Sequence, residues 1–228
     1  MSTAPVARPF EARHLQLARA VVAAIAAAMI TFSSDHSAAL GLAVFSGFAI
    51  TTALFLFVAA WLAFPAGARW PVLLLGAIDV VAGMVAGVGP LRTDGMFFGL
   101  VIAWAVASGI AELAIGLHAR RRAVTAQDRS DARDALSAGV LGLVLAVALL
   151  LVPAGFAWTY TIAEAHRTFT LTGITIGVGI FGGYAAIVAV YLGIAGFSPR
   201  KAEASAPAAN PAVAADAAAS DEKAGGAA

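Results

Sequence analysis

Six long apolar stretches constrain the fold of this chain more than any other feature of its sequence. A transmembrane helix needs about 20 predominantly apolar residues. The segments that meet this requirement are 15–33, 39–64, 70–89, 96–118, 136–158 and 169–197. Charged residues make up only 12% of the chain and hydrophobic residues 61%, a composition that leaves a soluble fold too few polar groups for its surface. The sequence therefore predicts an all-α, polytopic membrane protein with a six-span membrane domain over 15–198.

The first apolar segment allows two interpretations, because its uncharged run begins only after Arg19. An arginine near a helix end can reach back to the lipid headgroups, which makes the span long enough. An arginine-bearing start before a short apolar run is also typical of a cleaved signal peptide. The long charged lead and the lack of a convincing A-x-A cleavage site favour the membrane span.

The placement of basic residues predicts the orientation of the spans. With the N-terminus inside, 12 of the 14 Lys and Arg residues are cytoplasmic, and Arg92 and Arg167 are outside. We therefore expect a multi-pass protein of the bacterial inner (plasma) membrane with both termini, including residues 1–14, in the cytoplasm. The arginines in the predicted loop 119–135 fit a topology determinant better than an anionic-lipid site. Residues 199–228 are Ala-rich and predict a disordered cytoplasmic tail.

Several classes of function are disfavoured by what the sequence lacks. Without cysteine there is no thiolate chemistry, and the four histidines have no metal-ligand spacing. The P-loop, H-E-x-x-H, G-x-S-x-G and dinucleotide-binding motifs are absent, and no long basic patch suggests nucleic acid. We expect a non-enzymatic protein with no catalytic residues, no cofactor and no metal, whose partner is the lipid bilayer.

A local pattern repeats in the second, fourth and sixth spans, with starts at Ser46, Ser108 and Gly182. This repeat predicts three tandem helical hairpins. Small residues let membrane helices approach one another, and GxxxG spacing favours packing within the chain, with a homo-oligomer contact as the alternative. The predicted helix-packing glycines are Gly76, Gly83, Gly87, Gly109, Gly173, Gly177 and Gly183.

The hairpin from Arg69 to Arg122 resembles the repeat unit of HdeD-like acid-resistance membrane proteins. In that family a Trp starts a Gly-containing span, a Pro ends it, and a second span carries a small-Gly-Ile pattern before a basic end. The matching residues here are Trp70, Gly76, Gly83, Pro90, Trp104, Ser108, Gly109 and Arg120 to Arg122. The resemblance implies an inner-membrane protein of envelope or acid-stress physiology in enteric bacteria, without established catalytic residues.

Two carboxylates, Asp79 and Glu112, lie inside predicted spans, where a charged group is costly and therefore suggests a function. Both project from small-residue faces, at about 13 Å and 9 Å from the cytoplasmic span ends at 1.5 Å per residue. In an antiparallel hairpin they can meet, and one interpretation is a pair that shares a proton, as in a small transporter or proton-coupled channel. The alternative is a hydrogen-bonded pair, capped by Ser108 or a backbone carbonyl, that only fixes helix packing.

The topology gives a first testable prediction. A reporter fused after Arg200 should behave as a cytoplasmic marker, because an even number of spans places both termini on one side. An outside signal at this position would contradict the six-span topology and, with it, the depth argument for the two carboxylates.

Overall fold

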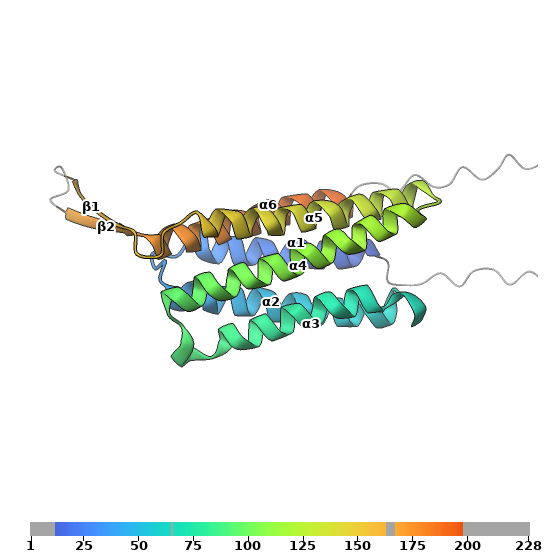
Figure 1. The fold of residues 1–228 in the computed structure, drawn as a ribbon, viewed down its shortest axis with the longest axis horizontal. Coiled ribbons are helices and arrows are strands. Elements are labelled where there is room, and N and C mark those ends of the chain that lie inside the picture. Colours follow the sequence, from blue (N-terminus) through green and yellow to red (C-terminus); the bar gives the residue numbers. More distant parts are fainter. Residues whose placement is uncertain (1–11, 65, 163–166, 198–228) are drawn as a thin grey trace, which may run out of the picture. The chain divides into compact units, whose positions relative to one another are not determined.

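The computed structural model describes residues 12–64, 66–162 and 167–197. Within these residues the chain forms six α-helices and one β-hairpin (Figure 1). The elements are α1 (Ala12–Thr31), α2 (Ala38–Leu62), α3 (Trp70–Gly87), α4 (Asp94–Arg122), α5 (Ala126–Leu150), β1 (Ala157–Ile162), β2 (Arg167–Thr172) and α6 (Gly173–Phe197). Short 3-10 turns at Ala66–Ala68 and Gly89–Leu91 lie before α3 and α4.

All six helices are long and apolar enough to cross a membrane, so the predicted all-α polytopic membrane fold is confirmed. The boundaries differ most around the fifth span. α5 ends at Leu150 rather than at 158, and α6 begins at Gly173 rather than at 169. The predicted loop 119–135 is reduced to three residues, because α4 continues to Arg122 and α5 already begins at Ala126. The predicted N-terminal and C-terminal segments, 1–14 and 199–228, lie almost entirely outside the described residues.

The charged segment before the fifth span is helical because it carries its own start signal. The Thr125 hydroxyl accepts a hydrogen bond from the Asp128 backbone N–H at 3.0 Å, and the Asp128 carboxylate accepts one from the Thr125 N–H at 2.9 Å. This reciprocal capping box satisfies backbone donors that a helix N-terminus otherwise leaves without partners. Hydropathy alone places the segment in a loop, whereas its capping residues extend α5 beyond the apolar stretch.

An antiparallel β-hairpin separates α5 from α6 and was not predicted from the sequence. Its register pairs Trp158 with Leu171 and Thr159 with Thr170, so aromatic and threonine side chains alternate between its two faces. Such period-two alternation of aromatic and β-branched residues favours strands. Figure 1 shows the hairpin extending beyond the ends of the helices. Because an open two-stranded sheet cannot satisfy its backbone in lipid, β1 and β2 do not belong to membrane spans.

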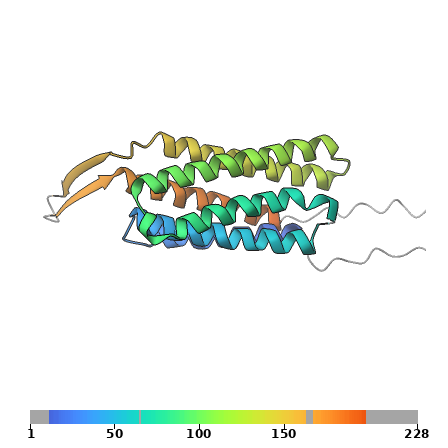
Figure 2. The same cartoon turned by 60° about the horizontal axis from the view of Figure 1, so that its bottom comes forward.

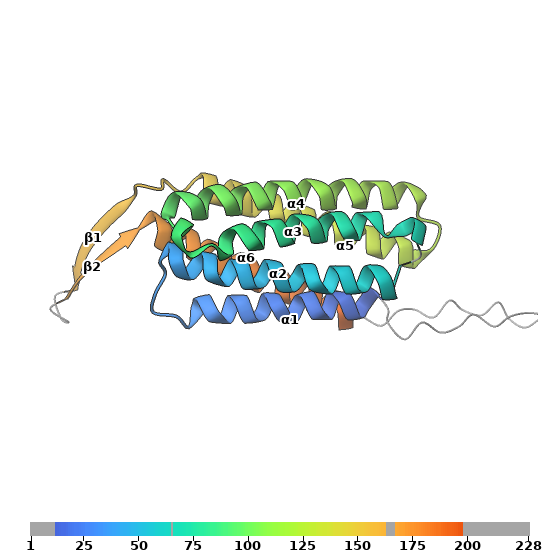
Figure 3. The same ribbon diagram turned by 90° about the horizontal axis from the view of Figure 1, so that it is seen from below.

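The helices pack in chain order, and α6 closes the bundle against α1 (Figures 1 and 2). The predicted hairpins are present as antiparallel neighbours, but the closest packing occurs between them. We call α1–α6, α2–α3 and α4–α5 the close pairs, since α1–α2, α3–α4 and α5–α6 pack more loosely. α1 begins and α6 ends at the same end of the bundle, which we call the terminal end (Figure 3). The β-hairpin lies at the opposite end, the hairpin end.

Glycines allow the two helices of each close pair to approach each other closely. A methyl group at Gly83 would lie 2.7 Å from the Ile50 side chain, and one at Gly109 would lie 3.0 Å from the Gly139 carbonyl oxygen. The other predicted glycines with near neighbours are Gly76 at Phe57, Gly87 at Ser46, Gly173 at Pro153 and Gly177 at Phe98. Gly183 does not pack as predicted, because the space where its side chain would lie is open. The adjacent Gly182 makes the contact instead, against Ile30 of α1.

The α4–α5 contact predicts a large effect for a small substitution. A methyl group at Gly139 would lie 2.8 Å from the backbone of both Gly109 and Leu113, which cannot move without shifting α4. We expect Gly139→Ala to lower the free energy of unfolding by about 1–3 kcal/mol through overpacking. Gly183→Ala is the matched control and should be neutral or stabilising, because alanine is the better helix former. Equal melting temperatures for the two variants in detergent would contradict the close packing.

Candidate functional site

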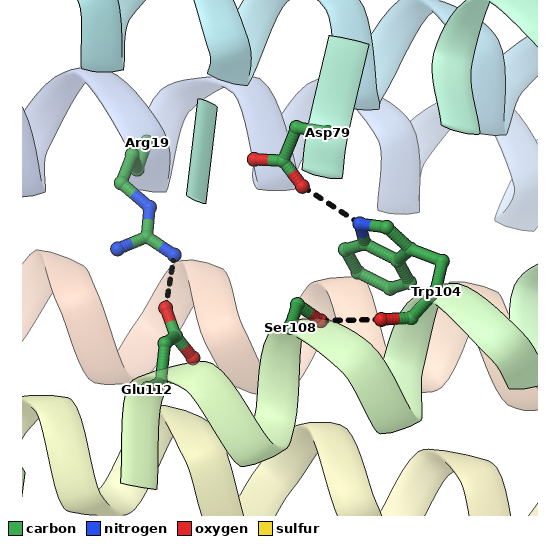
Figure 4. A network of polar contacts seen from close by, with 5 residues as sticks. All are labelled: Arg19, Asp79, Trp104, Ser108 and Glu112. Carbon is green, nitrogen blue, oxygen red and sulfur yellow. Dashed lines mark hydrogen bonds and ion pairs between the residues drawn. The ribbon is translucent and has the colours of Figure 1, made fainter. Parts of the chain in front are cut away.

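A partly buried ion pair joins the first and fourth helices. Arg19 Nη2 of α1 donates a hydrogen bond to Glu112 Oε1 of α4 at 2.9 Å, and the two side chains are 23% and 10% exposed. Figure 4 shows the guanidinium and the carboxylate pointing toward each other. The prediction that Arg19 reaches back to the headgroups is therefore wrong. An unpaired carboxylate in the apolar interior is costly, and Arg19 supplies the charge that compensates Glu112.

The second carboxylate, Asp79 of α3, has a different partner. Trp104 Nε1 of α4 donates to Asp79 Oδ1 at 2.7 Å, and Asp79 is only 5% exposed (Figure 4). The Ser108 hydroxyl, predicted as a possible cap for an acid, instead donates to the Trp104 carbonyl oxygen at 2.7 Å. Trp104, Ser108 and Glu112 follow one another at four-residue intervals and so lie along one face of α4.

Asp79, Ser108 and Glu112 line one small cavity, which we call the inner cavity. The two carboxyls make no hydrogen bond to each other, since each has its own partner. Because α4 ends at Arg122 rather than at His118, Glu112 lies about 15 Å from the end of its helix at 1.5 Å per residue, a depth similar to that of Asp79. The inner cavity measures about 20 Å³, and its lining is Arg19, Phe48, Thr52, Leu75, Asp79, Trp104, Ser108, Glu112, Tyr184 and Val188.

A larger pocket of about 270 Å³, which we call the vestibule, lies toward the terminal end. Arg19, Leu75 and Glu112 line both this pocket and the inner cavity, so the ion pair forms part of the wall between them. Asp131 and Asp134 of α5 also line the vestibule. Three carboxylates, those of Glu112, Asp131 and Asp134, and the guanidinium of Arg19 therefore lie in its lining.

The vestibule has a polar network of its own. Asp134 accepts hydrogen bonds from Gln16 Nε2 of α1 at 2.9 Å and from the Tyr191 hydroxyl of α6 at 3.1 Å. These contacts join α1, α5 and α6 near the terminal end. They also tie α1 into the bundle, which favours the membrane-span interpretation of this segment over a cleaved signal peptide.

A cluster of aromatic rings closes the inner cavity toward the hairpin end. It consists of Phe45, Phe48, Trp104, Phe181 and Tyr184, whose neighbouring ring centroids lie 5.1 to 6.4 Å apart. Most of these rings meet edge to face, the arrangement that aromatic pairs prefer. Phe45 and Phe181 are fully buried. The inner cavity is therefore bordered by the vestibule on the terminal side and by aromatic rings on the hairpin side.

Comparison of the chain with protein families, curated proteins and solved structures finds no match. The function must therefore be argued from the site. No group of three or more His, Cys, Asp or Glu residues suited to a metal ion occurs in the described part of the chain.

Sequence reasoning missed three members of the site. Arg19 was visible as a charge within an apolar segment, and Trp104 as a tryptophan far from either end of its span. Both signals could have been read as intramembrane partners for the two acids. Thr52 carries no such signal, because a threonine in an apolar helix is common and its position at the inner cavity follows only from packing.

The ion pair predicts strong coupling between its partners. We expect Arg19→Met to lower the free energy of unfolding by about 3 kcal/mol, because it leaves the Glu112 carboxylate buried without a counter-charge. Glu112→Gln in the Arg19→Met background should recover most of that loss. Unfolding of both single variants and the double variant in detergent measures the coupling. Purely additive effects would mean that the two charges do not depend on each other.

Proposed function

We propose that this multi-pass membrane protein moves protons, with Asp79 and Glu112 as the proton-binding groups of a small transporter or proton-coupled channel. The observation that carries this proposal is the charge composition of the inner cavity: two carboxyls face one guanidinium in an apolar bundle. If all three were ionised, the cavity would hold one uncompensated negative charge, which is costly in a membrane interior. A proton on one carboxyl removes that cost.

The hydrogen-bond partners of the two acids support Asp79 as the carrier of the resting proton. Glu112 has the guanidinium of Arg19 at 2.9 Å as its counter-charge. Among the described residues, the hydrogen-bond partner of Asp79 is the neutral indole N–H of Trp104. In this proposal Asp79 is the protonated carboxyl and Glu112 the carboxylate of the resting protein.

One-sided access supports transport over simple packing. Transporters alternate access to a fixed site near the middle of the membrane. The vestibule leads from the terminal end to the Arg19–Glu112 pair, and the aromatic cluster lies between the inner cavity and the hairpin end. With both termini in the cytoplasm, as the basic residues predict, this arrangement is the inward-facing state.

A non-enzymatic role in acid-stress physiology at the bacterial inner membrane is the second candidate. It is favoured by the resemblance of residues 69–122 to the HdeD-like repeat unit, a segment that contains both Asp79 and Glu112. The two candidates differ in the use of the acids, because a structural role needs only their hydrogen bonds. An amide at position 79 keeps the shape and removes the titration, so unchanged acid survival of an Asp79→Asn strain would favour the structural role.

Proton flux into liposomes tests the proposal directly. A potassium diffusion potential set with valinomycin should acidify vesicles that contain the wild-type protein faster than protein-free vesicles. Asp79→Asn should reduce this rate to that of protein-free vesicles, because the amide cannot carry the proton. Asp94→Asn, at an exposed position at the start of α4, is the matched control and should retain the wild-type rate. Wild-type flux equal to that of protein-free vesicles, or full flux in Asp79→Asn, would overturn the proposal.

A further inference from the structure

The Thr52 hydroxyl is the one buried side-chain polar atom without a hydrogen-bond partner in the described part of the chain. Thr52 lies on α2, is 3% exposed and lines the inner cavity. A buried threonine in a helix can bond the carbonyl oxygen four residues earlier, but this hydroxyl does not do so. Unpartnered buried polar groups are rare in folded proteins and often mark a bound water or ion.

The inner cavity has the size and the polar lining that one water molecule requires. Its volume is about 20 Å³, whereas a buried water needs at least about 10–15 Å³ and two to four polar partners. Thr52, Asp79, Glu112 and Tyr184 offer oxygen atoms to such a molecule. Asp79 Oδ1 already accepts from Trp104, and its second oxygen, Oδ2, has no hydrogen-bond partner among the described residues. A larger solute does not fit the cavity.

We propose that the inner cavity holds one water molecule, bound by the Thr52 hydroxyl, that passes protons between Glu112 and Asp79. This inference rests on the proposed function and names the path of the proton within it. The water supplies the bridge that the two carboxyls lack, since they do not bond each other directly. Water-mediated hydrogen bonds of this kind are nearly as favourable as direct ones.

The transfer starts from the state in which Asp79 has released its resting proton, and from there it balances without any further reactant. A proton from the vestibule first binds Glu112 and loosens its ion pair with Arg19. The Glu112 O–H bond then breaks as the water oxygen takes that proton, and the water gives one of its own protons to Asp79 Oδ2. Glu112 becomes a carboxylate again and re-forms its pair with Arg19, the water is regenerated, and Asp79 is protonated.

The groups that face Asp79 are consistent with this path. Arg19 comes from α1, Glu112 from α4 and Tyr184 from α6, whereas α2 contributes only the uncharged Thr52 and Phe48. Among the residues that line the inner cavity, Glu112 is therefore the acid that can exchange a proton with Asp79. Arg19 stays charged throughout and acts as the counter-ion.

Two substitutions of Thr52 test the water. Thr52→Val keeps the shape and removes the hydroxyl, whereas Thr52→Ser keeps the hydroxyl and is the matched control. We expect Thr52→Val to slow proton flux by roughly tenfold or more, because the water loses its anchor, and Thr52→Ser to stay near the wild-type rate. Wild-type flux in Thr52→Val would overturn the relay.

The melting temperature in detergent reports on the water whether or not protons cross the membrane. If the hydroxyl binds a water, Thr52→Val removes a hydrogen bond and should lower the melting temperature by roughly 2–4 °C. If the cavity is dry, the same substitution replaces an unpartnered hydroxyl by a methyl group and should raise it. A raised melting temperature would overturn the water site.

The flux of Asp79→Asn, measured in parallel, separates the two proposals. Loss of flux in Asp79→Asn with normal flux in Thr52→Val would reject the relay and leave the proposed function intact. Normal flux in both variants would reject the proposed function itself.

Discussion

The ion pair between Arg19 and Glu112 is the contact on which the rest of the bundle depends. It joins α1 to α4, two helices that are three positions apart in the chain-order arrangement and do not pack extensively against each other. A guanidinium and a carboxylate buried this far from either helix end must find each other, because each alone is costly in an apolar interior. The pair therefore fixes how deeply α1 sits against α4 and brings Glu112 toward Asp79.

The sequence predicted the helices well because hydropathy over about 20 residues reports directly on burial in lipid. The predictions were wrong where a local pattern, rather than mean hydropathy, determines the secondary structure. The start of α5 depends on the Thr125–Asp128 capping box, and the hairpin depends on the alternation from Trp158 to Thr161. A hydropathy window averages over both patterns. The packing prediction for Gly183 was wrong for a different reason. Gly182 and Gly183 are adjacent, and only the three-dimensional packing decides which of them faces α1.

The site was predictable in its acids but not in their partners. Asp79 and Glu112 stand out because carboxyl groups inside a span are rare. Their partners lie 25 residues away for Trp104 and 93 residues away for Arg19, so no local spacing connects them. The inner cavity is harder still to predict from the sequence. Side chains from five different helices line it, and it exists because they leave a small space between them unfilled.

Glycines and polar side chains stabilise different contacts in the bundle. Contacts within the close pairs are made by small residues, as at Gly83 and at Gly139. The site's polar contacts run between close pairs instead: Arg19–Glu112 joins α1–α6 to α4–α5, and Trp104–Asp79 joins α4–α5 to α2–α3. The aromatic cluster also draws one helix from each close pair. In the proposed transporter, a proton that neutralises Glu112 would act on a contact between close pairs and would leave each pair intact, as rigid-body alternation of access requires.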